Sequence, residues 1–278
     1  MSLRINTNIA ALTAHRNLTE TDRRMSVSLE RLSSGYRINR AKDDVAGLAI
    51  ANKFRVEVRG LRAAQQNAAQ ATALLQVAEG GTSQIEAIVE RLKELATSAA
   101  SDNTDSAGRA RLNAEAQKLL AEIDRIANDT KYGVTNLLNA SGGINLTFQI
   151  GSGNTAAEDQ INVTTSGALL SNNLGLNTIN LGSLVSAQAA LTSIDNSVTS
   201  VNVIQGEIGA AQSRLEFAAI NLSISIENIA ASESTIRDVD MAFEMVNFTR
   251  NQILMQAGTS MLAQANMIPQ NILALLGQ

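Results

Sequence analysis

Side chains that could catalyse a reaction or bind a metal ion are few in this sequence and widely spaced. The single histidine is His15 and there is no cysteine, so paired-histidine sites, thiolate ligands and a histidine-based triad lack candidates. The pair Asp43–Asp44 and the later Asp238, Asp240 and Glu244 do not follow the spacing of a calcium loop. Acidic residues at helix starts or beside arginines are common in proteins and need no functional explanation. We therefore expect no catalytic, cofactor-binding or metal site and no enzyme activity.

Phosphate and nucleic-acid binding can also be weighed from the sequence. Gly151–Gly153 lacks the third glycine and the following Lys-Ser or Lys-Thr of a nucleotide-binding loop. Residues 16–62 carry 11 Lys or Arg against 6 Asp or Glu, a net charge of +5, but acids lie within this stretch and aromatic residues are not interleaved through it. Residues 206–250 carry 3 basic and 7 acidic residues, a net charge of −4. We expect no nucleic-acid partner and two chain ends of complementary charge.

The composition favours long helices packed through small side chains. The 278 residues include no Trp, 5 Phe, 2 Tyr and 1 Pro. The N-terminal residues mix Ile and Leu with Asn, Thr and Arg, unlike the apolar run of a cleavable signal peptide. No stretch approaches about 18 uninterrupted apolar residues, so we expect no membrane insertion. The absence of cysteine fits a reducing cytosol or an exported protein and leaves the compartment open.

The strongest periodic signal lies in the C-terminal third, at alternating steps of three and four. The stripe reads Leu184, Ala187, Leu191, Ile194, Val198, Val201, Gln205, Ile208, Gln212, Leu215, Ala219, Leu222, Ile226 and Ile229. Such a stripe is typical of a coiled coil, and an unbroken helix over 184–275 would extend about 140 Å at about 1.5 Å per residue. Residues 74–95 and 112–126 follow the same steps. We expect three helices that share one seam, with a helical hairpin at 101–106.

Between residues 133 and 182 the sequence becomes rich in Gly, Asn and Thr. Residues 146–150 and 161–164 alternate apolar with polar side chains. This alternation predicts two short strands around a Gly-Ser-Gly-Asn loop, in a β segment at about 144–182.

Two terminal arms are set off by hinges predicted at Leu32–Gly35 and Ser232–Thr235, where glycine or clustered hydroxyl groups weaken a helix. Residues 251–278 contain no charged side chain, although apolar residues recur there every seven positions. An intramolecular core helix is the alternative, but its solvent face would normally carry charge. The uncharged arm is therefore predicted to be buried against identical copies of the chain. The residues expected to mediate self-assembly are Ile5, Ile9, Leu12, Leu29, Leu32, Phe243, Val246, Leu254, Met261, Ile268 and Leu275.

Two long motifs at opposite ends of the chain resemble those of bacterial flagellin. The first is Leu32–Asn39, LSSGYRIN, followed by Asp43–Ile50, DDVAGLAI. The second comprises Ile236–Ala242, Gln256–Gly258 and Ala263–Gln270, which read IRDVDMA, QAG and AQANMIPQ. They occur in the family's order, so the resemblance covers essentially the whole chain.

The resemblance implies a mainly α fold, with a long coiled-coil-like helical rod, a small β-hairpin region and paired terminal helices. It places an inner domain, disordered in the monomer, at 1–43 and 234–278, and the rod at 44–233, without the large variable outer domains of many flagellins. The departures are small, since Val45 replaces the usual Ala and Gly133 stands where Asn often follows the aromatic residue.

The resemblance also implies a function. A flagellin is exported unfolded through the flagellar type III channel, without a cleaved signal peptide, and polymerises at the filament tip outside the cell for swimming motility. Its partners are itself, an export chaperone and the export apparatus, and the filament cap and hook-junction proteins. It uses no cofactor.

A further implied partner is Toll-like receptor 5. The positions that match the family's receptor contacts are Arg91, Leu95 and Glu115, with Glu90 and Lys93 in place of the common Gln and Arg. The other interpretation is that Leu95 belongs to the helical seam and that the charged residues form an exposed helix face.

Three other functions remain as alternatives. A hook-filament junction protein of the same superfamily would share the fold, although the complete C-terminal motif favours the filament subunit. A coiled-coil signalling domain would explain the heptads but would need a membrane or kinase contact. An enzyme within residues 133–182 would have few charged groups and no histidine there to act as acid or base.

Overall fold

The structure, a computed structural model, describes residues 7–140 and 142–276, with side chains as far as residue 267. In chain order the elements are α1 (Ile9–Ser34), α2 (Val45–Ala99), α3 (Ser106–Asp129), β1 (Lys131–Tyr132), β2 (Thr135–Asn136), β3 (Asn145–Gln149), α4 (Ala156–Asp159), β4 (Gln160–Thr164), α5 (Leu184–Arg237) and α6 (Met241–Leu276). The fold is mainly helical with small antiparallel strand pairs, as the sequence predicted.

The chain divides into two compact units, which are described separately. The terminal unit is formed by the two chain ends, as far as residue 56 and from residue 228, and the central unit by residues 57–227. The sequence had suggested boundaries at 43/44 and 233/234, closer to the chain ends. At the first boundary, the linker after α1 packs against the start of α2, so both belong to the terminal unit. Ile38 of this linker is 2% exposed, and a Cβ added at Gly47 of α2 would lie 2.9 Å from the Ile38 Cδ1.

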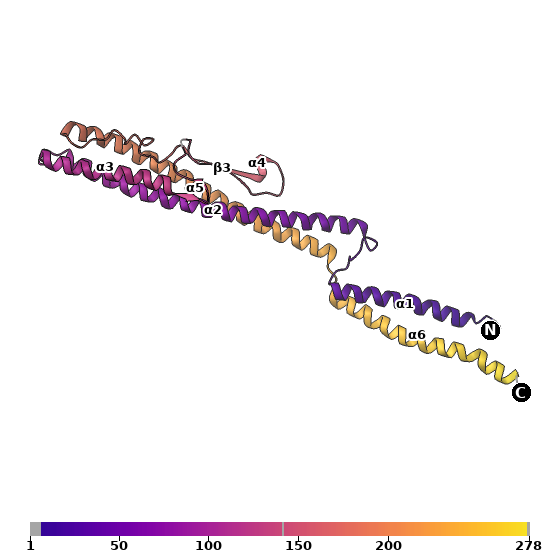
Figure 1. Ribbon diagram of the computed structural model, residues 1–278. Coiled ribbons are helices and arrows are strands. Elements are labelled where there is room, and N and C mark those ends of the chain that lie inside the picture. Colours follow the sequence, from indigo (N-terminus) through magenta and orange to yellow (C-terminus); the bar gives the residue numbers. More distant parts are fainter. Residues whose placement is uncertain (1–6, 141, 277–278) are drawn as a thin grey trace. The chain divides into compact units, whose positions relative to one another are not determined.

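In the central unit, α2, α3 and α5 lie side by side (Figure 1). The Gln212 side chain on α5 donates to Glu79 on α2 over 2.9 Å, and Lys93 pairs with Asp195 at 2.7 Å, so α2 and α5 run antiparallel. The predicted hairpin at 101–106 is confirmed, since α2 ends at Ala99 and α3 begins at Ser106. Asp105 caps α3 by accepting from the Gly108 N–H over 2.7 Å.

The shared seam is the core of the central unit. Fully buried side chains come from all three helices, and they include Leu75, Ile85, Leu92, Ile123, Ile194, Ile208 and Leu215. Two glutamines of the predicted stripe are half-buried and contact α2 through their amides, Gln212 as described and Gln205 at 3.5 Å from the Ser83 hydroxyl. The seam therefore combines apolar packing with amide contacts that align α5 on α2.

The predicted strands form an antiparallel hairpin of β3 and β4, with Leu146 opposite Val163 and Phe148 opposite Ile161. Sequence analysis missed the short pair β1 and β2, whose turn uses Gly133 at φ 62°. Beyond β4 the segment to residue 183 lacks strands, although the β segment was expected to continue to 182. Leucines such as Leu169, Leu176 and Leu181 cover the core there without forming a sheet.

Only the first predicted hinge is confirmed. Helix α1 ends at Ser34, and Gly35 follows with the left-handed φ of 75° that glycine tolerates. The second prediction was wrong, because α5 continues through Ser232–Thr235 to Arg237. The hydroxyls of Ser232 and Thr235 donate to carbonyls four residues earlier, at 2.8 and 3.0 Å, so they are satisfied within the helix. The helix break lies between Arg237 and Met241.

Two adjacent glycines of α2 provide a matched test of the central packing. A Cβ at Gly81 would lie 2.6 Å from the Thr130 hydroxyl and 2.8 Å from Leu138 Cδ1, whereas a Cβ at Gly80 has nothing within 4 Å. We expect Gly80→Ala to raise the free energy of unfolding by about 1 kcal/mol through helix propensity. We expect Gly81→Ala to lower it by about 1 kcal/mol or more, because overpacking outweighs that gain. Urea unfolding measures both, and equal shifts in the two variants would contradict this packing.

Candidate self-assembly surface

The terminal unit is built on an antiparallel pair of helices, α1 and α6, which lie side by side in Figure 1. Asn8 caps α1 by accepting from the Ala11 N–H, and its amide donates to the Ala265 carbonyl of α6 over 2.8 Å. At the other end of the pair, the Arg31 guanidinium lies 3.6 Å from the Glu244 carboxylate. An arginine in the last turn of α1 therefore pairs with the acidic residue in the first turn of α6.

This helix pair buries very little of its own surface. Among the described side chains of α1 and α6, only Ser28, Glu244 and Ala265 are buried. Most of the expected self-assembly residues are exposed, between 50% and 66%, namely Ile9, Leu12, Leu29, Phe243, Val246, Leu254 and Met261. Leu32 is half-buried, Ile5 lies outside the described residues, and the side chains of Ile268 and Leu275 lie outside the described side chains. The exposed apolar surface has no cover within the described chain.

The exposed surface is wider than the heptad positions alone predicted. Met241, Met245, Ile253 and Met267 of α6 are also exposed, at 48% or more. For Ile253 and Met267, the signal that could have found them is the absence of charge from residues 251–278, because it leaves no charged face to separate from an apolar one. The helix is apolar or amide-lined around much of its circumference.

Two grooves lie within this apolar surface. One, of about 640 Å³, runs between α1 and α6 and is lined by residues such as Ile9, Leu18, Leu254 and Met261. Gly258 also lines this groove, and a Cβ added there would lie 3.1 Å from Leu18 Cδ1. The other, of about 490 Å³, follows α6 alone past Met245, Val246, Thr249, Arg250, Ile253 and Leu254. Grooves of this kind accept the side chains of a second apolar helix.

The chain between α1 and α2 is held against the chain between α5 and α6. Tyr36 and Asp238 form an antiparallel bridge, the Arg37 N–H donates to the Arg237 carbonyl over 2.7 Å, and the Val239 N–H donates to the Gly35 carbonyl over 3.0 Å. The Arg237 guanidinium also lies 4.1 Å from the centre of the Tyr36 ring. We call this linker pair the elbow.

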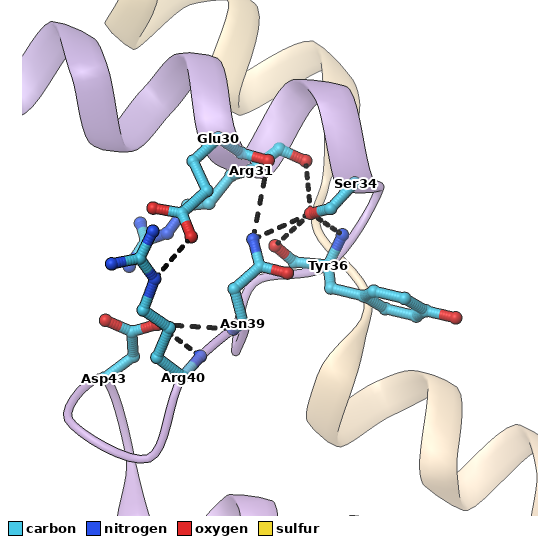
Figure 2. A network of polar contacts seen from close by, with 7 residues as sticks. All are labelled: Glu30, Arg31, Ser34, Tyr36, Asn39, Arg40 and Asp43. Carbon is cyan, nitrogen blue, oxygen red and sulfur yellow. Dashed lines mark hydrogen bonds and ion pairs between the residues drawn. The ribbon is translucent and has the colours of Figure 1, made fainter.

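A polar network shapes the first linker of the elbow (Figure 2). The Asp43 carboxylate accepts the backbone N–H groups of Arg40 and Asn39 at 2.9 and 3.3 Å. The Asn39 amide donates to the Ser34 hydroxyl over 2.7 Å, and the Arg40 guanidinium contacts Glu30 at 2.8 Å. The motif that resembled the family signature is thus a hydrogen-bonded loop at the end of α1.

Within this loop, the pKa of Asp43 is shifted from its ordinary value. The pKa of the Asp43 carboxyl lies below its ordinary value, chiefly because the Arg40 N–H donates to it, with the Asn39 N–H and the charges of Lys42 and Arg31 lowering it further. A lowered folded-state pKa contributes stability above the ordinary pKa, and this contribution is lost as the pH falls through the folded value. The loop should therefore loosen in acid.

We expect amide hydrogen exchange at Asn39 and Arg40 to accelerate, beyond its intrinsic pH dependence, as Asp43 becomes protonated. In Asp43→Asn, which cannot ionise, that acid-dependent step should disappear. Asp22→Asn serves as the control, because Asp22 is exposed on α1 and should leave the step intact. Retention of the acid-dependent step in Asp43→Asn would contradict this role of the carboxylate.

The three expected receptor contacts lie in the central unit. Arg91 is exposed and pairs with Glu94 at 2.7 Å and Glu115 at 3.0 Å, which raises the pKa of its guanidinium. Leu95 is 3% exposed and belongs to the core. The structure therefore brings Arg91 and Glu115 together on a surface and places Leu95 in the core.

The described residues contain no group of three or more His, Cys, Asp or Glu side chains placed to hold a metal ion. Among the same residues, no helix is both long enough and apolar enough to cross a bilayer.

Sequence comparison relates both ends of the chain to one family. The model of the bacterial flagellin N-terminal helical region matches residues 5–142, and that of the bacterial flagellin C-terminal helical region matches residues 191–276. The chain is 40% identical to a flagellin of Halalkalibacterium halodurans, with 98% of this chain and 99% of that protein covered. It is 38% identical to the flagellar filament 33 kDa core protein of Treponema phagedenis, with the same coverage, and 38% identical to a Bacillus subtilis flagellin, with 99% and 100% covered.

Solved structures share the fold. A Bacillus cereus flagellin matches with a TM-score of 0.50 and 25% identity, over 60% of this chain and 94% of that one. A putative flagellar hook-associated protein from Vibrio parahaemolyticus matches with a TM-score of 0.58 over 70% of this chain and 100% of that one. The second match, at 12% identity, shows a shared fold alone.

Proposed function

Because the chain belongs to the bacterial flagellin family and is a structural subunit of a flagellar filament, we propose that it polymerises by packing the exposed apolar faces of α1 and α6 against identical copies. The observation that carries this proposal is the exposure of Ile9, Leu12, Phe243 and Met261 on a helix pair with almost no buried core.

The magnitudes favour coupling between ordering of the arms and assembly. Fixing a residue's backbone costs about 1–2 kcal/mol at room temperature, and α1 and α6 are long helices. Burying one large apolar side chain gains about 1.5–3 kcal/mol, but this pair leaves most of them in water. Neighbouring copies supply the missing burial, so the arms should be disordered in a dilute monomer and order as they enter the filament.

The same feature supports the finer steps of the proposal. A subunit whose ends are held by a thin helix pair can be exported unfolded through the flagellar channel, with a chaperone covering its apolar arms until release. Polymerisation then takes place outside the cell at the filament tip, between the cap and the hook-junction proteins, and serves swimming motility. A cysteine-free chain has no disulfide to form or break on that route.

The proposal predicts that a chain ending at residue 249 cannot polymerise, because it loses the greater part of α6. Its central unit should remain helical by circular dichroism, since the seam of that unit lies within residues 57–227. Electron microscopy under polymerising salt is the readout. Filaments of normal width from this truncated chain would contradict the role given to α6.

A point variant gives a finer measure of the same effect. Leu254→Asn replaces an exposed apolar residue that lines both apolar grooves, and should raise the critical concentration for polymerisation roughly tenfold for each 1.4 kcal/mol lost per subunit. Gln252→Asn, at an exposed polar position of the same helix, should leave it unchanged. Equal effects from the two substitutions would count against apolar burial as the driving force.

The alternative that the sequence analysis left open is a hook-filament junction protein of the same superfamily. Seeding distinguishes the two roles. A filament subunit elongates fragments of its own filaments without limit, whereas a junction protein adds to an end and stops. We expect elongation.

Recognition by Toll-like receptor 5 is a further part of the proposal. Its support is the exposed pair formed by Arg91 and Glu115, which presents charged groups of both signs on one surface. Leu95 is buried and would act by supporting that surface rather than by touching the receptor. In a receptor reporter assay, Arg91→Ala should reduce the response of a folded monomer, and an unchanged response would remove this surface from the contact.

A further inference from the structure

Methionines are concentrated in one helix of this chain. Five of the seven belong to α6, namely Met241, Met245, Met255, Met261 and Met267, and none lies in residues 57–227, which form the central unit. Four of these five are exposed, by between 48% and 64%, and Met255 is half-buried. The sulfur atoms of the chain are therefore gathered on the helix whose packing against identical copies the proposed function requires.

The methionine thioether is the group of this chain that mild oxidants attack. The chain contains no cysteine, so the thioethers are its only sulfur atoms. Two-electron oxidants such as hydrogen peroxide convert a thioether into a sulfoxide. A sulfur lone pair attacks one peroxide oxygen, the S–O bond forms as the O–O bond breaks, and the departing hydroxide takes the proton of the transferred oxygen and leaves as water. Sulfur loses two electrons and the peroxide gains them.

Two of the exposed methionines line the apolar grooves of the terminal unit. Met245 lines the groove that follows α6 alone, and Met261 lines the groove between α1 and α6. Met241 and Met267 are exposed to a similar extent but line neither groove. All four thioethers thus contact water in the helix pair, and unfolding of the arms exposes them further. A place in an apolar groove distinguishes Met245 and Met261 from the other two.

A sulfoxide at a groove position changes the surface that assembly is proposed to cover. Methionine is an unbranched, flexible and apolar side chain that fills irregular gaps, and its sulfoxide is polar and chiral. In water the sulfoxide oxygen is hydrated. Burial against an apolar face removes this hydration, which is unfavourable unless a hydrogen-bond donor replaces it. Oxidation therefore removes part of the apolar burial on which incorporation depends.

We propose that Met245 and Met261 are oxidation sites at which peroxide prevents a free subunit from polymerising. The inference rests on the proposed function and adds a chemical modification that acts on it. In the free subunit both thioethers are accessible to the oxidant, and a subunit oxidised at either position adds poorly to a filament. Within the filament a neighbouring copy covers the same thioethers and protects them. Peroxide thus acts on unassembled subunits and spares the assembled ones.

A sorting experiment on the unaltered chain tests this directly. Free subunits are treated briefly with hydrogen peroxide, so that each methionine is oxidised in only a fraction of the chains, and are then freed of oxidant and seeded with filament fragments. Filaments are separated from unassembled protein by sedimentation, and peptide mass spectrometry with fragmentation measures the sulfoxide at each methionine in both fractions. The sulfoxides of Met245 and Met261 should be enriched about tenfold or more in the unassembled fraction. Those of Met241 and Met267 should be shared equally.

Paired leucine variants provide a second measurement. Leucine is close to methionine in volume and has no sulfur to oxidise. Met245→Leu with Met261→Leu should polymerise after a peroxide treatment that stops the unaltered chain. Met241→Leu with Met267→Leu is the matched control and should remain sensitive to peroxide. Treatment of the oxidised, unaltered chain with methionine sulfoxide reductases should restore its polymerisation.

Two results would overturn the inference. One is an equal distribution of all four sulfoxides between filaments and unassembled protein, and the other is identical peroxide sensitivity of the two paired variants. An untreated, unaltered chain that never polymerises would instead refute the proposed function.

Discussion

One constraint governs this protein: its terminal helices expose apolar surface that a single chain cannot cover. Two long helices packed only against each other can bury one narrow stripe each, and α1 and α6 bury less than that. Contact of the remaining Ile, Leu, Met and Phe side chains with water is unfavourable, and it ends only when another apolar surface covers them. For a filament subunit this is the useful condition, because a neighbouring subunit can supply the cover that the single chain lacks.

The central unit answers the same constraint differently. Three helices share a seam in which residues such as Ile85, Ile123 and Ile208 are fully buried, and the coil after β4 covers what the helices leave open. This unit therefore buries within one chain the kind of apolar surface that the terminal helix pair leaves exposed. The linker between α1 and α2 combines the buried Ile38 side chain with a network of hydrogen bonds and an ion pair.

Sequence periodicity predicted the helices and the seam because both repeat over many turns, and errors in single positions average out. The hairpin at 101–106 was predicted because Asp105 is a strong cap. Local features were less accessible. Ser232 and Thr235 suggested a hinge, but their hydroxyls bond within α5, and the chain instead breaks beyond Arg237.

The candidate assembly residues on α1 and α6 could be chosen from heptad spacing, but their full extent could not. Met245 and Ile253 lie outside the heptad positions, and only the structure shows that their side chains are exposed. Likewise, the contact of Arg237 with the Tyr36 ring joins opposite ends of the chain, and no local sequence pattern predicts it.

Hydrogen exchange compared between dilute monomer and filament tests the central claim most directly. Backbone amides of residues 9–34 and 241–267 should exchange rapidly in the isolated subunit while those of the central seam are protected, and polymerisation should slow the arms by orders of magnitude. Arms as well protected in the monomer as in the filament would contradict the account, because they would then need no neighbour to cover them.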